Sequence, residues 1–139
     1  MRKEPGLAAL VFILSAVVGA CAGDGTGLGE GGEIEPTLAS IQENVFSPIC
    51  TACHTGAASP LGLALDAGLS YSRLVGVASV QVPALLRVAP GKPDSSYIVW
   101  KIEGRSGIIG GRMPLGLAPL TSEQIQAIRD WIAAGALQQ

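Results

Sequence analysis

The sequence is poor in the side chains that most metal and nucleic-acid sites require. Its 139 residues include one histidine, three cysteines and two methionines, of which one is Met1. A single histidine excludes metal centres built from several imidazoles. Charged residues make up only 14 % of the chain, and residues 37–139 carry seven bases and six acids. We therefore expect no basic surface for nucleic acid.

The N-terminus has the pattern of an export signal. Arg2 and Lys3 precede an uncharged apolar run over residues 7–20. This run is shorter than the roughly 20 residues that a membrane-spanning helix needs. A basic start, an apolar middle and small residues at the end are typical of a secretory signal peptide, here residues 1–20. Export permits oxidised cysteines in the mature chain.

The end of the run, VGAC at residues 18–21, resembles the lipobox of bacterial lipoproteins. That resemblance implies that Cys21 is acylated and anchors the protein to the membrane on the periplasmic side of the envelope. Ala22 follows, where some bacteria use Asp for inner-membrane retention, so the outer membrane is favoured. The alternative is ordinary cleavage, because Ala20-Cys21-Ala22 also fits a signal-peptidase site. The mature protein would then be free in the periplasm or secreted.

Two regions follow the predicted cleavage. Residues 21–36 are rich in glycine and acidic residues, which predicts a flexible tether. Residues 37–139 are long enough for one modest hydrophobic core.

Helical signals occur at both ends of this domain. A helix is expected from Thr37, because Leu38, Ile41 and Val45 recur at helical spacing. Ser47-Pro48 should end it. At the other end, Thr121 has capping-box spacing to Gln124. An apolar stripe follows, formed by Ile125, Ile128 and Ile132, and Gly135 is the expected stop.

Two further helices are expected between them. Ser70 could cap a short helix over residues 71–78, and Asp94 or Ser95 could cap a helix that ends at Gly104. No convincing run of alternating strand residues appears. The prediction is an all-α domain of three to five short helices, joined by long loops rich in glycine and proline. Such loops leave room for something other than side chains at the centre.

The stretch PICTACHTG, residues 48–56, places Cys50, Cys53 and His54 in a C-x-x-C-H pattern. A redox-active dithiol would favour a strand before the pair, and none is evident. Structural zinc requires four ligands and an iron–sulfur cluster normally requires four cysteines. A disulfide between Cys50 and Cys53 would close a very short loop and stabilise little.

Covalent haem accounts for every position of the pattern, because C-x-x-C-H is its attachment signature. The thiols of Cys50 and Cys53 would form thioethers with the two vinyl groups, and His54 would bind the iron as proximal ligand. A low-spin electron carrier needs a second axial ligand, usually His or Met. Met113, in the loop sequence GRMP, is the candidate for this distal ligand. Lys101 or an open position are the alternatives.

With these residues the domain resembles the class I c-type cytochromes, in particular small bacterial lipoprotein cytochromes related to the planctomycete-type cytochrome c domain. The matching segments are PICTACH, RVAPGKPDSSYIVWKI, GRMP and LTSEQIQAIRDWIAAGA. The resemblance implies a cytochrome c-like fold wrapped around one haem c, with His54 and Met113 axial and the terminal helices packed together. Pro60 lies nearer to His54 than the usual orienting proline, so the acceptor of the histidine Nδ1 proton stays open.

The expected function is single-electron transfer to and from redox partner proteins, not catalysis. Apolar side chains should exclude water from the site: Leu63, Leu65, Leu74, Ile98, Ile109 and Leu115. Several bases could pair with haem carboxylates, steer an acidic partner or remain solvated: Arg87, Lys92, Lys101, Arg105 and Arg112. The alternative functions are a gas-binding haem domain, a haem subunit of a larger oxidoreductase and, more remotely, a small peroxidase.

Overall fold

The computed structural model describes Met1 and residues 33–139. The rest of the predicted signal peptide (1–20), Cys21 and the predicted tether up to residue 32 lie outside the described residues. Among the helices of residues 33–139, none has the length and apolar character to cross a membrane. Near the start of the described range, the backbone N–H of Ile34 donates to Glu123 Oε1 at 3.2 Å. Ile34 also packs against the hydrophobic core.

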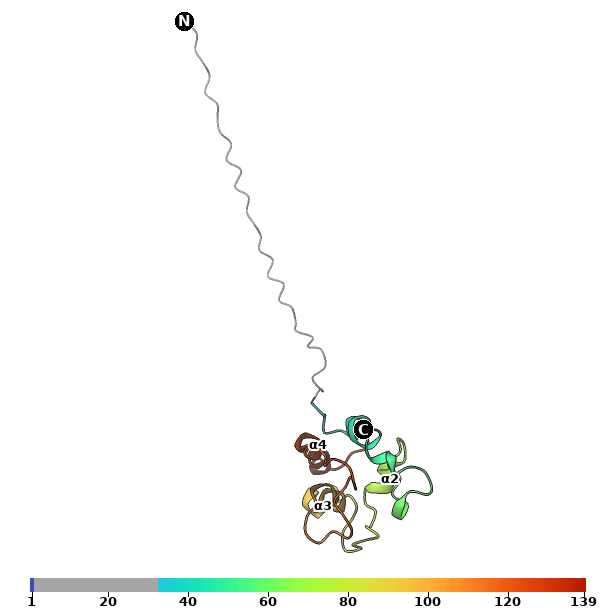
Figure 1. Ribbon diagram of the computed structural model, residues 1–139. Helices are drawn as coiled ribbons and strands as arrows, with labels where there is room; N and C mark the ends of the chain where they lie inside the picture. The colour runs from blue at the N-terminus through green and yellow to red at the C-terminus, as the bar shows by residue number, and fades with distance from the viewer. Residues whose placement is uncertain (2–32) are drawn as a thin grey trace. The chain divides into compact units, whose positions relative to one another are not determined.

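The domain is built from short helices and long loops (Figure 1). Within residues 33–139 there is no strand, only three isolated β-bridges. This confirms the prediction of an all-α class with several short helices. The α-helices are α1 (Leu38–Ile41), α2 (Ser70–Leu74), α3 (Tyr97–Glu103) and α4 (Ser122–Ala133). The other helical segments are the π-helix η1 (Gln42–Phe46) and the 3-10 helices η2 (Cys50–Ala52), η3 (Pro60–Gly62) and η4 (Pro93–Ser95).

Local sequence signals set three of the helix ends as predicted. The Thr37 side chain accepts from Ser40 N at the start of α1. Thr121 and Gln124 form the complete capping box of α4. Gly104 ends α3 in the left-handed conformation at φ 71°, which a residue without Cβ adopts at little cost.

The two inner caps were predicted wrongly. Helix α2 begins at Ser70 itself, whose hydroxyl donates to Gln42 Oε1 instead of capping the helix. It ends at Leu74, because the chain then turns extended and Val75 pairs with Val88. Helix α3 follows Ser96, not Asp94 or Ser95. The Ser96 hydroxyl is used in contacts with Ala89 and Lys92. In both places the serine hydroxyl is hydrogen-bonded to groups outside the helix and does not cap the first turn.

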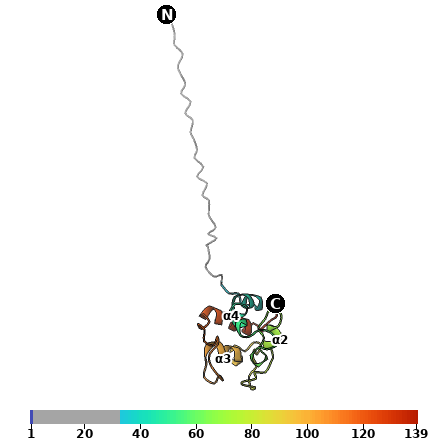
Figure 2. The same cartoon turned by 45° about the vertical axis from the view of Figure 1, so that its right-hand side comes forward.

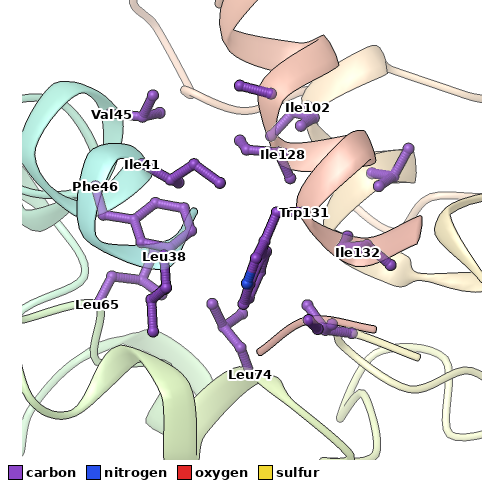
Figure 3. Packing of buried hydrophobic residues seen from close by; sticks show 14 of the residues in the cluster. Leu38, Ile41, Val45, Phe46, Leu65, Leu74, Ile102, Ile128, Trp131 and Ile132 are labelled. Carbon is purple, nitrogen blue, oxygen red and sulfur yellow. The ribbon is translucent and has the colours of Figure 1, made fainter. Parts of the chain in front are cut away.

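The core lies where α4 packs against α1 and α3 (Figures 1 and 2). Trp131 of α4 is only 2 % exposed, and Figure 3 shows it pointing into the space bordered by Phe46 and Leu74. Its indole N–H donates to the backbone oxygen of Leu137 at 2.8 Å, which satisfies the buried polar group. Burying an aromatic side chain of this size contributes on the order of 3 kcal/mol, so this cluster anchors the frame that carries the loops.

Candidate haem site

The long loops enclose an apolar cavity of about 410 Å³. This volume lies in the range of small-molecule and cofactor pockets. Its walls combine the C-x-x-C-H turn with α3, the segment 79–87 and two long loops, which we call the histidine loop (residues 55–66) and the methionine loop (residues 105–120). Most lining side chains are apolar: Ile49, Pro60, Leu61, Leu63, Leu65, Val80, Ile98, Ile102, Pro114, Leu115, Leu117 and Leu120.

Residues 50–54 form one tight helical turn. The backbone N–H groups of Cys53 and His54 both donate to the Cys50 oxygen, at 3.2 and 2.9 Å. The turn places Cys50, Cys53 and His54 on the cavity wall. Both thiols are free, with Cys53 exposed and Cys50 half-buried. Burial raises the pKa of the Cys50 thiol to about 11, so it stays protonated at neutral pH. A reactive dithiol needs the opposite shift.

The His54 ring has a defined tautomer. Its Nδ1 lies 3.1 Å from the backbone oxygen of Leu63, which can only accept, so Nδ1 carries the proton. In the neutral ring this leaves Nε2 unprotonated and free to bind a metal. Desolvation is the main cause that lowers the His54 pKa, and the positive charges of Lys101 and Arg87 add to it. The hydrogen bond with Leu63 opposes this shift. The site therefore favours the uncharged, ligating form.

The histidine loop closes on itself at its base. Leu65 N donates to His54 O at 2.7 Å, and Asp66 accepts from the Thr55 hydroxyl and, at 2.8 Å, from Gly56 N. The bond from Thr55, followed by that from Gly56, lowers the Asp66 pKa. These bonds fix the two ends of the loop, and they hold the Leu63 carbonyl where it meets the imidazole.

The π-helix η1 is hydrogen-bonded to the histidine loop through the side chain of Gln42. Gln42 Nε2 donates to Leu65 O at 2.8 Å, while Gln42 Oε1 accepts from the Ser70 hydroxyl at 2.7 Å. One amide side chain thus joins η1, the histidine loop and α2. Single π-turns are frequent near functional sites, and here the turn lies just before Cys50.

Met113 reaches the same cavity wall from the methionine loop. Its backbone N–H donates to Lys101 O of α3 at 2.8 Å. The neighbouring Arg112 Nε donates to Ile102 O at 2.7 Å. Lys101 Nζ donates to the oxygens of Ile109 and Gly111, at 2.9 and 2.8 Å. Since the Lys101 amine is engaged in this way, it is a weaker candidate than Met113 for the distal ligand.

Two of the five predicted bases line the cavity, and both are buried. Arg87 and Lys101 are each 8 % exposed. Arg87 donates to the backbone oxygens of Leu61, Gly62 and Arg73, at 2.6, 3.3 and 2.8 Å. It therefore joins the histidine loop to α2. The apolar neighbours of Arg87 in LLRVA are a sequence signal for its burial that the prediction did not use.

The remaining bases lie elsewhere. Lys92 is exposed, and Arg105 forms ion pairs with Asp94 and Glu103 at 2.8 and 2.5 Å. Arg112 is exposed, and its guanidinium donates a hydrogen bond to Ile102 O of α3.

The prediction of which apolar residues surround the site was partly right. Leu63, Leu65, Ile98 and Leu115 line the cavity. Leu74 belongs to the core instead, and Ile109 is an exposed residue of the methionine loop outside the lining. Sequence reasoning missed Gln81 and Tyr97, two polar residues of the cavity wall. No local pattern marks them, because they meet only through the tertiary fold.

No family model matches the chain, and neither a curated protein nor a solved structure matches it. Within residues 33–139 no three His, Cys, Asp or Glu side chains group as a metal site. The geometry of the cavity therefore carries the functional inference. Its donors are two thiols, one imidazole with a free Nε2 and one thioether on an apolar wall. This donor set fits covalently attached haem.

Proposed function

We propose that this protein is a monohaem c-type cytochrome that carries single electrons. One observation supports this most strongly: Cys50, Cys53, His54 and Met113 line one apolar cavity, although Met113 comes from a distant part of the chain. In this proposal Cys50 and Cys53 hold haem through thioethers, and His54 Nε2 and the Met113 sulfur are the iron ligands. Redox partner proteins would exchange the electrons.

Each part of the site has a role in this function. Bound haem supplies a one-electron Fe(II)/Fe(III) couple. The Leu63 carbonyl fixes the ring orientation and tautomer of His54, as outer-shell acceptors do for metal-bound histidines. The apolar walls exclude water. A thioether ligand on a dry site favours the reduced state.

Replacement of Met113 tests the proposed ligand pair. The exported wild-type chain should have a low-spin spectrum in both oxidation states and bind carbon monoxide slowly. We expect Met113→Ala to lose the low-spin ferric spectrum and to bind carbon monoxide at least about tenfold faster, since an axial position opens. Leu69→Ala, which shortens an exposed leucine outside the cavity lining, is the control and should behave like wild type.

Two results would contradict the carrier function. Rapid carbon monoxide binding by the wild-type protein would favour the gas-binding alternative. An unchanged spectrum in Met113→Ala would remove Met113 as a ligand.

Attachment and anchoring are tested by intact mass. We propose that the mature protein carries one haem, and that Cys50→Ala together with Cys53→Ala abolishes its covalent attachment. We also propose that Cys21 is the acylated N-terminal residue and holds the protein on the periplasmic side of a membrane. A mature mass without acyl chains, with the protein in the soluble fraction, would contradict the anchor but not the haem.

A further inference from the structure

Helix α3 presents two buried polar side chains to the methionine loop. Tyr97 and Lys101 are 5 % and 8 % exposed. They are four residues apart, so they share one face of the helix. Both line the cavity, and both make hydrogen bonds to Ile109 in the first half of the loop.

Lys101 contacts the loop at three points. Its ammonium donates to the oxygens of Ile109 and Gly111, at 2.9 and 2.8 Å. Its own backbone oxygen accepts from Met113 N at 2.8 Å. One residue thus fixes alternate positions of the segment 109–113, the last of which is Met113.

The charge of Lys101 has no carboxylate partner among the ion pairs of the described domain. Burying a cation without a partner is costly unless strong hydrogen bonds replace its water. The carboxylates nearest in sequence on α3 and η4, Glu103 and Asp94, are occupied by Arg105 and Arg129. The loop carbonyls therefore act as the main partners of the ammonium, and hydrogen bonds from a charged donor are stronger than neutral ones.

Tyr97 and Gln81 complete the attachment of Ile109. Ile109 N donates to the Tyr97 hydroxyl at 3.0 Å, and that hydroxyl donates to Gln81 Oε1 at 3.2 Å. Gln81 Nε2 donates to Ile109 O at 3.1 Å. The backbone polar groups of Ile109 are held by three side chains, although the residue itself is exposed.

We propose that Lys101, with Tyr97 as its helper, is a positioning residue that holds the methionine loop so that Met113 stays on the cavity wall. The inference rests on the proposed function for its consequence, which is that Met113 remains bound to iron. Without the Lys101 amine, the segment 109–113 would lose two charged hydrogen bonds at once. The loop would then open more often and leave the distal position accessible to outside ligands.

The experiment uses the full exported, haem-loaded chain with Lys101→Leu, Lys101→Gln and Tyr97→Phe. Leucine is chosen over methionine because a new thioether in the cavity could itself bind iron. Glutamine keeps one amide donor without the charge. The matched control is Lys92→Leu, which makes the same change at an exposed lysine. The readouts are the carbon monoxide association rate of the reduced protein and the hydrogen-exchange rate of the Met113 amide.

We expect Lys101→Leu to raise both rates at least about tenfold, because two charge-assisted hydrogen bonds are lost. Lys101→Gln and Tyr97→Phe should raise them less, and Lys92→Leu should leave them unchanged. The amides of α4 should exchange as in wild type in every variant. If Lys101→Leu does not fold, Lys101→Gln and Tyr97→Phe decide the outcome.

Two results would overturn the positioning role. In the first, the folded Lys101 variants keep the wild-type exchange rate at Met113. In the second, exchange accelerates equally in α4, which would mean that Lys101 only stabilises the whole domain. Failure of the proposed function looks different, because Met113→Ala would then match wild type. The Met113 amide would still report whether Lys101 holds the loop.

Discussion

The loop that follows His54 and the loop that carries Met113 are held in different ways. The histidine loop closes on itself through the bond from Leu65 N to His54 O and through Asp66, which binds Thr55 and Gly56. The methionine loop lies against α3 and is attached to Lys101, Tyr97 and Ile102 of that helix.

Local contacts therefore orient His54, whereas tertiary contacts hold Met113. His54 is oriented by contacts within the thirteen residues 54–66, and Arg87 and Gln42 then join that unit to the rest of the domain. The position of Met113 depends instead on hydrogen bonds between its loop and Lys101 of the separate element α3. We therefore expect the methionine loop to open before the histidine loop when the domain is perturbed. Of the two proposed iron ligands, Met113 should be the one that outside ligands replace.

The largest effect is expected at Arg87, the buried cation of the histidine side. Arg87→Leu should lower the free energy of unfolding by about 2–4 kcal/mol, because three backbone carbonyls lose the charged donor that joins them. Urea unfolding measures the change. Arg73→Leu is the control, since its side chain is exposed, and should cost under about 0.5 kcal/mol. Equal costs for the two variants would show that the Arg87 bonds do not hold the histidine loop.

A smaller effect is expected at Gly104, where α3 turns into the methionine loop. Its φ is 71°, and an added Cβ would lie 3.0 Å from Cδ of Arg112. Gly104→Ala should lower the free energy of unfolding by about 1–2 kcal/mol, because a residue with Cβ is strained there. In Gly104→Ala, hydrogen exchange should accelerate more at the Met113 amide than at the Gly56 amide. A larger acceleration at Gly56 would contradict the conclusion that the two loops are held separately. Gly56→Ala has a similar φ of 65° in open space and is the matched control.

A pH-dependent effect is expected at the base of the histidine loop. Hydrogen bonds from Thr55 and Gly56 lower the pKa of Asp66 in the folded chain. A lowered carboxyl pKa stabilises the fold above the unfolded pKa of about 3.9, and the contribution is lost as pH falls through the folded value. Asp66→Asn should therefore speed exchange of the Gly56 amide at pH 6. The difference from wild type should shrink toward pH 2, and a pH-independent difference would contradict the role of the charge.

The smallest effect is expected at Arg112, beside Met113. Its guanidinium donates to Ile102 O but is exposed to water, which can replace the bond. Arg112→Ala should change the free energy of unfolding by less than about 0.5 kcal/mol and leave carbon monoxide binding unchanged. A large gain in carbon monoxide binding would transfer the positioning role from Lys101 to Arg112.

Local signals predicted the parts of the fold that local chemistry controls. Thr37, Thr121 and Gly104 mark helix ends because the cap hydrogen bonds and the left-handed turn involve residues within one turn of the chain. Ser70 and Asp94 were misassigned because their side chains are used in tertiary contacts with Gln42 and with Arg105 and Arg129. A short polar side chain can serve either purpose, and the sequence does not distinguish them.

The sequence by itself determined the chemistry of the candidate site: one C-x-x-C-H turn, one histidine and one methionine past the signal peptide. Only the tertiary structure decided how these groups are held. It selected Leu63 as the acceptor for His54, and it buried Arg87 and Lys101 while leaving Lys92 exposed. The physical reason is that a buried cation is tolerated only where several carbonyls converge on it. That convergence is made by loops and helices that are distant in sequence, so no local pattern can reveal it.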